Sequence, residues 1–304
     1  MTNSASRSTV LPTSLTVFAP AKINLVLRIL DRRSDGYHNL WSLMQTVQLE
    51  DELALSLSDS HSGITLRCDE PSLKTDPSNL VYRAAAAVLE GSGRAVGLDM
   101  VLTKRIPMGA GLGGGSSDAA ATIIGLNRLL NLGWSREKMT HIGQAIGSDV
   151  PFFFFAPSAI VEGRGEQVAP VRMKGSRWVV LVNPGFSVET RWAYQQLSVH
   201  RTGAQPLSAV HAGLGKTSEL LWEEVLQTAE NDFEATVFKA YPDLRRIKQK
   251  LLAAGAETAL LSGSGATVFG VFRDEMPARQ AELSFQTEPH LKVYTVSAST
   301  VLRQ

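Results

Sequence analysis

The segment 107–123, "PMGAGLGGGSSDAAATI", decides the interpretation of this sequence, because five of the seven positions from Gly109 to Gly115 are glycine. Glycine loses more backbone entropy on folding than any other residue. A folded segment with this many glycines therefore needs a role that offsets the entropy cost. An alternating, strand-like segment (97–106) precedes the glycines, and an alanine-rich, helix-like segment follows them. A helix N-terminus after a glycine loop offers free N–H groups and the positive end of the helix dipole to an anion. The segment therefore predicts a phosphate site rather than a flexible linker.

Two common phosphate loops fit this segment poorly. Gly109, Gly111 and Gly114 satisfy G-x-G-x-x-G, but among so many glycines the match is weak. The acidic residue of a dinucleotide site, expected about 20 residues later, would fall in "NLGWSREK". A Walker A loop is excluded because Gly115 occupies its lysine position. Backbone amides, a metal ion and residues elsewhere must therefore neutralise the phosphates.

Length and composition narrow the class of protein. A chain of 304 residues with 44% apolar residues favours two globular domains. A net charge of +1 argues against a nucleic-acid partner, and no apolar run reaches the roughly 20 residues of a membrane span. The single cysteine, Cys68, excludes an intrachain disulfide and a thiolate zinc cluster, and favours the cytoplasm. Residues 1–15 are interpreted as a flexible tail rather than a transit peptide.

Periodicity predicts an α+β sandwich, because strands and helices alternate along much of the chain. The run "PFFFF" at 151–155 is interpreted as a buried strand or the entry to one, and 199–216 as a loop. Strands are predicted at 16–30, 41–48, 51–58, 63–68, 97–106, 158–162, 177–185, 257–272 (a pair) and 291–298. Helices are predicted at 78–90, 116–133, 136–147, 217–230, 242–254 and 276–285.

Four motifs carry a resemblance to a known family. "PMGAGLGGGSSDAAA" resembles the phosphate loop of the GHMP kinases, although Ala110 stands where glycine is frequent. The segment 20–53, "PAKINLVLRILDRRSDGYHNLWSLMQTVQLEDEL", is similar to the first motif of the 4-diphosphocytidyl-2-C-methyl-D-erythritol kinase family. "IGSDVPFFF" (146–154) and "LSGSGATVFGVF" (261–272) match later motifs of that family in the right order.

The resemblance implies a fold and an activity. The expected fold is the two-domain α+β GHMP kinase fold. A ribosomal protein S5 domain 2-like domain would span 16–165, and a ferredoxin-like α/β sandwich would span 166–304. The implied reaction uses ATP and Mg²⁺ to phosphorylate the 2-hydroxyl of a small cytidine diphosphate substrate, in a monomer or weak homodimer. Two alternatives remain open: another GHMP kinase, such as a mevalonate or homoserine kinase, and a nucleotide-binding module without kinase chemistry.

The family's catalytic and nucleotide-binding residues map onto the motifs. From the sequence alone Asp149 would be an exposed turn residue, but the resemblance implies that it is the catalytic base. Lys22 would then keep Asp149 ionised and polarise the acceptor hydroxyl. Ser116 or Ser117 would contact Mg²⁺. The predicted ATP-binding residues are Pro107, Met108, Gly109, Ala110, Gly111, Leu112, Gly113, Gly114, Gly115, Ser116 and Ser117.

Other residues are assigned to the acceptor and to support of the loop. Tyr37 and His38 would hold the cytosine, and Tyr194 would stack on its opposite face. Ser78 or Asn79 would cap the helix 78–90, and Asn79 is also interpreted as an adenine contact. The predicted substrate-binding residues are Asn24, Tyr37, His38, Lys104, Asp149, Thr190 and Tyr194, and the predicted loop-supporting residues are Gly263 and Gly265.

Overall fold

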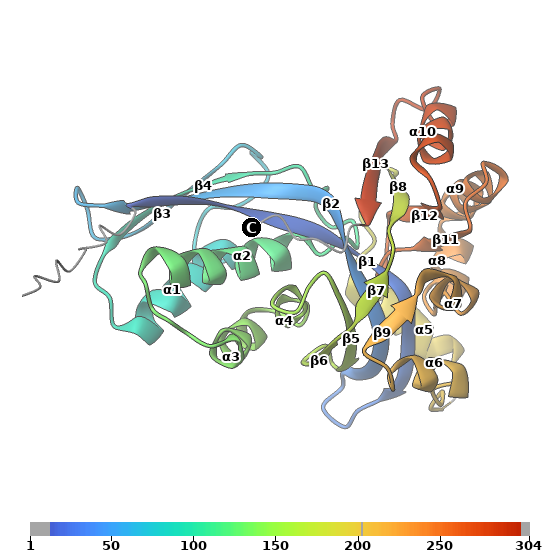
Figure 1. The fold of residues 1–304 in the computed structure, drawn as a ribbon, viewed down its shortest axis with the longest axis horizontal. Helices are drawn as coiled ribbons and strands as arrows, with labels where there is room; N and C mark the ends of the chain where they lie inside the picture. The colour runs from blue at the N-terminus through green and yellow to red at the C-terminus, as the bar shows by residue number, and fades with distance from the viewer. Residues whose placement is uncertain (1–12, 202, 299–304) are drawn as a thin grey trace, which may run out of the picture.

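The computed structural model describes residues 13–201 and 203–298, which form two main β-sheets with helices packed on them (Figure 1). The larger sheet has the order β10-β1-β2-β4-β3, with β5 paired to β2 and β6 paired to β5. The smaller sheet has the order β11-β12-β8-β13, and β7 pairs with β9. The strands are β1 (Ser14–Arg32), β2 (His38–Ser58), β3 (Gly63–Cys68), β4 (Gly97–Thr103), β5 (Ser158–Gly163), β6 (Gln167–Pro170), β7 (Arg172–Lys174), β8 (Arg177–Asn183), β9 (Glu219–Leu221), β10 (Glu230–Asn231), β11 (Thr258–Leu261), β12 (Val268–Phe272) and β13 (Lys292–Ala298).

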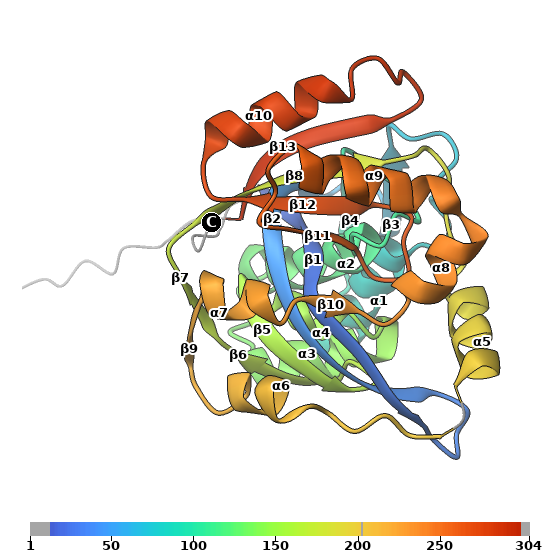
Figure 2. The same cartoon turned by 90° about the vertical axis from the view of Figure 1, so that its right-hand side faces the viewer.

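Helices cover the outer faces of both sheets. In Figure 1, α1 and α2 lie along one face of the larger sheet, and Figure 2 shows α9 and α10 beside the smaller sheet. The helices are α1 (Leu80–Ser92), α2 (Gly114–Leu129), α3 (Arg136–Ile146), α4 (Val150–Phe153), α5 (Thr190–His200), α6 (Ala209–Leu214), α7 (Trp222–Gln227), α8 (Glu234–Ala240), α9 (Pro242–Ala253) and α10 (Glu275–Ser284).

The long β1–β2 hairpin links the two halves of the molecule. The strands pair antiparallel along nearly their whole length, with register shifts after Pro20, Asn24 and Ile29. Such irregularities bend and twist a strand, and the hairpin accordingly curves out of the larger sheet toward the smaller one (Figures 1 and 2). The predicted strands 41–48 and 51–58 are one continuous strand, because pairing with β1 resumes at Glu50, opposite Pro20, directly after a register shift.

The smaller sheet is buried on both faces. Val179 and Leu181 of β8 belong to the apolar cluster shared with β1 and β2. Val180 and Val182, which alternate with them, belong to the cluster shared with α9 and α10. Successive side chains of a strand point to opposite faces, so this apolar run fixes the sheet between the hairpin and the helices.

Several predicted boundaries were wrong. The segment 199–216, predicted to be a loop, contains α6, which Ser208 caps. One of its buried residues is His211, which is polar, so the helix lacks the apolar periodicity by which it could have been predicted. The predicted helix 217–230 begins as β9 and becomes helical only at α7, and α5 was not predicted. The aromatic run 151–155 contributes most of the short helix α4, not a strand.

The α+β organisation is confirmed, while the predicted domain boundary is untested. β6 and β10 follow position 165 in the sequence but complete the larger sheet, by pairing with β5 and β1. Of the predicted tail, residues 1–12 lie outside the described residues, and Ser14 already begins β1. Within the described part of the chain, no helix combines the length and apolarity that crossing a membrane requires.

Candidate active site

The glycine loop connects β4 to α2 through backbone conformations that favour glycine. Gly109, Gly111 and Gly113 have φ angles of 61°, 77° and 71°. A Cβ at Gly111 would overlap the carbonyl oxygen of Ser262, and one at Gly113 would lie 2.9 Å from Cγ of Lys22. Close approach therefore requires glycine at two positions, and it places the loop against both β1 and the second half of the chain.

The loop lines a cavity of about 400 Å³. α2 begins at Gly114, and among the described residues no side chain caps its first turn, which leaves N–H groups available to a ligand. Asn79 lines the same cavity, but its amide caps α1 by accepting from Val81 N–H and donates to the Lys74 carbonyl. Of the predicted ATP-binding residues, ten line this cavity: Pro107, Met108, Gly109, Ala110, Gly111, Leu112, Gly113, Gly114, Gly115 and Ser116.

A turn from the second half of the chain holds the loop from the opposite side. Ser262 donates its hydroxyl hydrogen to the Gly111 carbonyl at 3.0 Å, and Thr267 N–H donates to the Ala110 carbonyl at 3.2 Å. Gly263 and Gly265 lie within this turn and have φ angles of 56° and 97°. The predicted supporting turn and the glycine loop are therefore in direct contact.

Lys22 and Asp149 form an ion pair beside the loop. Lys22 Nζ lies 3.6 Å from Asp149 Oδ2, with side chains that are 4% and 31% exposed. Asp149 precedes α4, but its carboxylate makes no capping hydrogen bond within the described structure, so it is not simply a helix cap. Burial lowers the pKa of Lys22, and the charge of Asp149 opposes that shift. The ammonium of Lys22 is therefore buried, whereas a ligand can reach the partly exposed carboxylate of Asp149.

Asn24 holds the ion pair from behind. Its Oδ1 accepts from Lys22 Nζ at 2.7 Å and from Gly263 N–H at 3.0 Å, and its Nδ2 donates to Ser42 Oγ at 2.9 Å. Asn24 is buried, so the structure makes it a support of Lys22 and of the turn. Its predicted contact with substrate stays a prediction.

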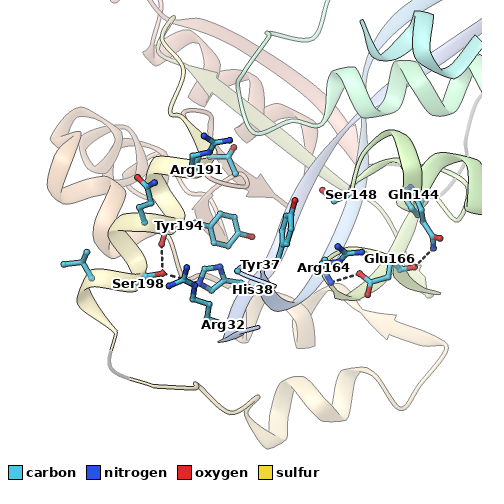
Figure 3. Close-up of a pocket in the computed structure, with 15 residues that line it drawn as sticks. Arg32, Tyr37, His38, Gln144, Ser148, Arg164, Glu166, Arg191, Tyr194 and Ser198 are labelled. Atoms are coloured by element: carbon cyan, nitrogen blue, oxygen red, sulfur yellow. Dashed lines mark hydrogen bonds between the residues drawn. The ribbon is translucent and has the colours of Figure 1, made fainter. Parts of the chain in front are cut away.

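A larger cavity of about 990 Å³ is shown in Figure 3. Ser148, the neighbour of Asp149 in sequence, lines it, whereas Gly113, which packs on Lys22, lines the smaller cavity. Each member of the ion pair therefore adjoins a residue that lines one of the two cavities. The larger one is lined by Arg32, Gly36, Tyr37, His38, Gln144, Ser148, Pro151, Arg164, Glu166, Thr190, Arg191, Tyr194, Gln195, Ser198 and Val199.

The predicted aromatic residues meet in this larger cavity. Tyr37 is 61% exposed, and the guanidinium of Arg164 lies 5.4 Å from its ring centroid. The His38 ring stacks on Tyr194 at 5.0 Å between centroids, and its Nε2 lies 3.2 Å from the Ser198 hydroxyl (Figure 3). His38 therefore covers one face of Tyr194. The ring of Tyr37 is approached by the long side chain of Arg164.

Electrostatics keep His38 neutral and its neighbour protonated. Burial, together with the charge of Arg32, lowers the pKa of His38. Desolvation of the Tyr194 hydroxyl, together with the charge of Asp149, raises the pKa of that group. A neutral imidazole and a phenol can each donate a hydrogen bond to a nucleobase and accept one from it.

Comparisons with known proteins agree with this geometry. The model of the GHMP kinases N terminal domain matches residues 79–156, and that of the GHMP kinases C terminal domain matches 211–290. A Geobacter protein named 4-diphosphocytidyl-2-C-methyl-D-erythritol kinase is 44% identical over 88% of this chain and 92% of its own. The Geobacter metallireducens protein of that name is 42% identical over 94% and 99%. The chain belongs to this family of GHMP kinases.

Solved structures support the same assignment. A crystal structure of 4-(cytidine 5'-diphospho)-2C-methyl-D-erythritol kinase has a TM-score of 0.74 and 31% identity, over 93% of this chain and 99% of that one. Homoserine kinase from Cytophaga hutchinsonii also has a TM-score of 0.74, at 19% identity over 98% of each chain, and shows the fold alone. The GHMP kinase fold predicted from the sequence is thus confirmed.

Two serines lie in the first turn of α2 of this GHMP kinase; Ser116 lines the glycine-loop cavity, where its hydroxyl suits a nucleotide-bound magnesium ion, whereas Ser117 does not line it. No group of three or more His, Cys, Asp or Glu residues among those described gathers to hold a metal, so the phosphates would supply most of its ligands. Ser117 is buried, and its hydroxyl has no hydrogen-bond partner in the described structure. Mg²⁺ prefers oxygen ligands and keeps several waters, which a single hydroxyl can complement.

The remaining predicted residues lie at the edges of the two cavities. Thr190 lines the larger cavity, and its hydroxyl lies 2.9 Å from that of Ser264. Lys104 lines the smaller cavity, but its ammonium is held by the carboxylates of Asp51 and Asp118. Its predicted contact with substrate phosphate stays a prediction, and the structure gives the ammonium two buried partners.

Sequence reasoning missed three arginines of this GHMP kinase. Arg32, Arg164 and Arg191 line the larger cavity from different sides, and no described residue forms an ion pair with them (Figure 3). Gly163 and Gly165 flank Arg164 in the β5–β6 turn. This pair of glycines could have indicated a tight turn whose central side chain, that of Arg164, points into a site. Single arginines at surface positions give no such signal.

Proposed function

We propose that this chain transfers the γ-phosphoryl group of ATP to the 2-hydroxyl of 4-diphosphocytidyl-2-C-methyl-D-erythritol, within the methylerythritol phosphate route to isoprenoids. The products are the 2-phosphate and ADP. One observation carries the proposal: the Lys22–Asp149 pair adjoins Gly113, which lines the glycine-loop cavity, and Ser148, which lines the larger cavity with Tyr37 and His38. Two ligands can thus meet at one acid–base pair.

The glycine loop binds the triphosphate. Backbone N–H groups at the start of α2 donate to phosphate oxygens. The missing side chains at Gly111 and Gly113 let the loop pack against Ser262 and Lys22, which holds these N–H groups in place. Ser116 or Ser117 would hold a Mg²⁺ ion together with the phosphates, and the ion would supply charge neutralisation. Catalysis is mostly positioning and electrostatics, as phosphoryl transfer requires little covalent chemistry from the protein.

Asp149 and Lys22 activate the acceptor. Asp149 takes the proton of the 2-hydroxyl as the oxygen forms its bond to the γ-phosphorus, and the bond from that phosphorus to the bridging oxygen of ADP breaks. Lys22 pairs with the carboxylate and stabilises negative charge on the attacking oxygen. Asn24 fixes the Lys22 ammonium while this occurs.

The larger cavity favours a nucleotide-containing acceptor. A volume of about 990 Å³ is at the upper end of ordinary ligand pockets, and far exceeds what mevalonate or homoserine would fill. The exposed Tyr37 ring offers a stacking face for a base, and neutral His38 offers polar atoms to its edge. The unpaired arginines suit a diphosphate.

A coupled ADP-release assay tests this function. The cytidine diphosphate acceptor should support turnover, whereas mevalonate and homoserine at equal concentration should not, and CMP should compete with the acceptor but not with ATP. Turnover on mevalonate or homoserine alone would refute the acceptor assignment.

We also propose a cytoplasmic location, which the single Cys68 favours, and a monomer or weak homodimer.

A further inference from the structure

A buried ion cluster lies beneath the glycine loop. Lys104 Nζ donates to Asp118 Oδ2 at 2.7 Å and to Asp51, and all three side chains are at most 7% exposed. Asp51 is on β2, Lys104 follows β4, and Asp118 is in the second turn of α2. None of these contacts reaches the Lys22–Asp149 pair, so catalysis as described above makes no use of them.

The cluster joins the two ends of the glycine loop. Asp51 Oδ1 accepts from the backbone N–H groups of Arg105 and Ile106, at 2.6 and 2.8 Å, and so holds the chain as it enters the loop. Asp118 belongs to the helix by which the chain leaves the loop. One ammonium, that of Lys104, therefore ties the entry of the loop to its exit.

Such a tie matters because the loop itself supplies little rigidity. Its left-handed glycines lose much backbone entropy when they are ordered, and no described side chain caps the helix that follows. A phosphate cradle binds well only when its N–H groups already point at the ligand, since otherwise binding must provide the ordering free energy. Anchors on both sides of the loop reduce that cost.

Stability alone explains the cluster poorly. A buried ion pair is often no more stabilising than apolar residues of similar volume, because both charges lose their hydration. Here two carboxylates share one ammonium, and within the described structure Asp118 Oδ1 has no hydrogen-bond partner. Burial accordingly raises the pKa of Asp118 to about 7, against the attraction of Lys104. Charge-assisted hydrogen bonds do, however, fix direction and distance, which apolar packing does not.

We propose that Asp51, Lys104 and Asp118 are positioning residues that hold the glycine loop in its nucleotide-binding conformation. The inference rests on the proposed function in one respect, that the nucleotide binds at this loop. The cluster acts on ATP affinity through the loop backbone and leaves the acceptor cavity and the phosphoryl-transfer step unchanged.

Calorimetric titration with a non-hydrolysable ATP analogue tests the proposal on Asp118→Ala and Asp118→Asn. Asp118→Ala removes the tie, and we expect its dissociation constant to rise at least tenfold. Asp118→Asn keeps an acceptor oxygen for Lys104 but loses the charge, so it should recover part of that loss. In steady-state assays the KM for ATP should rise in the same order, with kcat and the acceptor KM within about twofold of wild type.

Hydrogen exchange supplies a readout that does not depend on activity. Amides of residues 108–116 should exchange faster in Asp118→Ala than in wild type without nucleotide, and the analogue should restore protection in both. A uniform increase in exchange across α1 and β4 would instead indicate general destabilisation and would contradict a role confined to the loop.

A second ion cluster, whose two carboxylates are 55% and 31% exposed, provides a control for the loss of one carboxylate from a buried cation. Arg177 is 7% exposed and lies between Glu223 and Glu257, at 2.5 and 2.7 Å, near the start of β8. Glu257→Ala removes one of two carboxylates from one buried cation, as Asp118→Ala does, but at residues that line neither cavity. It should leave analogue affinity and loop exchange unchanged.

The outcomes separate this inference from the proposed function. A wild-type protein that binds no ATP analogue would refute the nucleotide assignment itself. Wild-type affinity in Asp118→Ala, or an equal loss in Glu257→Ala, would overturn the positioning role while the kinase assignment stands. An Asp118→Asn protein that fails to fold at any temperature would also overturn it, because the cluster would then be a requirement of folding.

Discussion

The two cavities of this kinase are built from different parts of the polypeptide. The smaller one is lined mainly by the backbone of one continuous stretch, 106–116, and the larger one by side chains from several separate segments. The loop that lines the smaller cavity is held by hydrogen bonds to the Ser262 turn and to β1, and by the buried ion cluster around Lys104. Tyr37 in the larger one is 61% exposed.

The difference separates two tasks of a kinase. Backbone N–H groups offer the same donors whatever residues surround them, so they suit a triphosphate that is common to many kinases. Side chains can be exchanged without altering the fold, so they suit the acceptor, which differs between kinases. Substitutions on the two sides should therefore change different kinetic constants, and those at the Lys22–Asp149 pair should change turnover.

Asp149→Ala should have the largest effect. Loss of a positioned base costs roughly 10²–10⁴ in rate, so kcat should fall by at least two orders of magnitude. Affinity for an ATP analogue should stay near the wild-type value, because Asp149 does not line the glycine-loop cavity. Single-turnover assays and analogue titration measure the two quantities separately.

Ser148→Ala is the control for that substitution. Ser148 is exposed, lines the larger cavity and neighbours Asp149, yet its side chain makes none of the contacts described for the ion pair. It should retain kcat within a few fold. Near-normal turnover in Asp149→Ala would exclude the carboxylate from proton transfer and leave only positioning to this region.

Gly111→Ala should have the next largest effect, on the nucleotide side alone. Its methyl group would overlap the Ser262 carbonyl, and a left-handed φ of 77° costs an alanine roughly 1–2 kcal/mol. We expect the KM for ATP to rise at least tenfold with the acceptor KM unchanged. Gly133→Ala is the matched control, because Gly133 also has a left-handed φ, of 63°, but its Cβ would meet no atom within 4 Å and it lines neither cavity.

A result on the wrong side of the molecule would break the comparison. Should Gly111→Ala raise the acceptor KM as much as the KM for ATP, the two cavities would be coupled through the loop. Gly133→Ala should behave as wild type in both assays. An equal loss there would show that strain at a left-handed glycine, and not the Ser262 overlap, weakens nucleotide binding.

Much of the fold could be predicted from the sequence where local patterns are strong. Asn79 as a cap and the alternation in 97–106 gave α1 and β4 nearly in place. The failures occur where tertiary contacts override local pattern. β2 continues through a register shift because β1 pairs with it on both sides of the shift. α6 buries a histidine that hydrogen bonds to Ser208 and the Thr228 carbonyl.

The site divides in the same way. The glycine loop was predicted because its residues are contiguous and their lack of side chains is itself the signal. The Lys22–Asp149 pair required the family resemblance, since 126 intervening residues hide the contact from any local pattern. The role of Asp51 could not be predicted, because a buried aspartate in a strand is recognisable only from the N–H groups and the ammonium that it meets.

Tyr37→Ala should have the smallest of these effects, confined to the acceptor. Base stacking on an aromatic ring contributes roughly 1–3 kcal/mol, and a ring that is 61% exposed should lie at the lower end. The acceptor KM should therefore rise about tenfold, since 1.4 kcal/mol corresponds to that factor, while the KM for ATP stays constant. Tyr37→Phe keeps the ring and should stay within about threefold of wild type. A loss in Tyr37→Phe equal to that in Tyr37→Ala would mean that the hydroxyl, and not the ring face now covered by Arg164, recognises the acceptor.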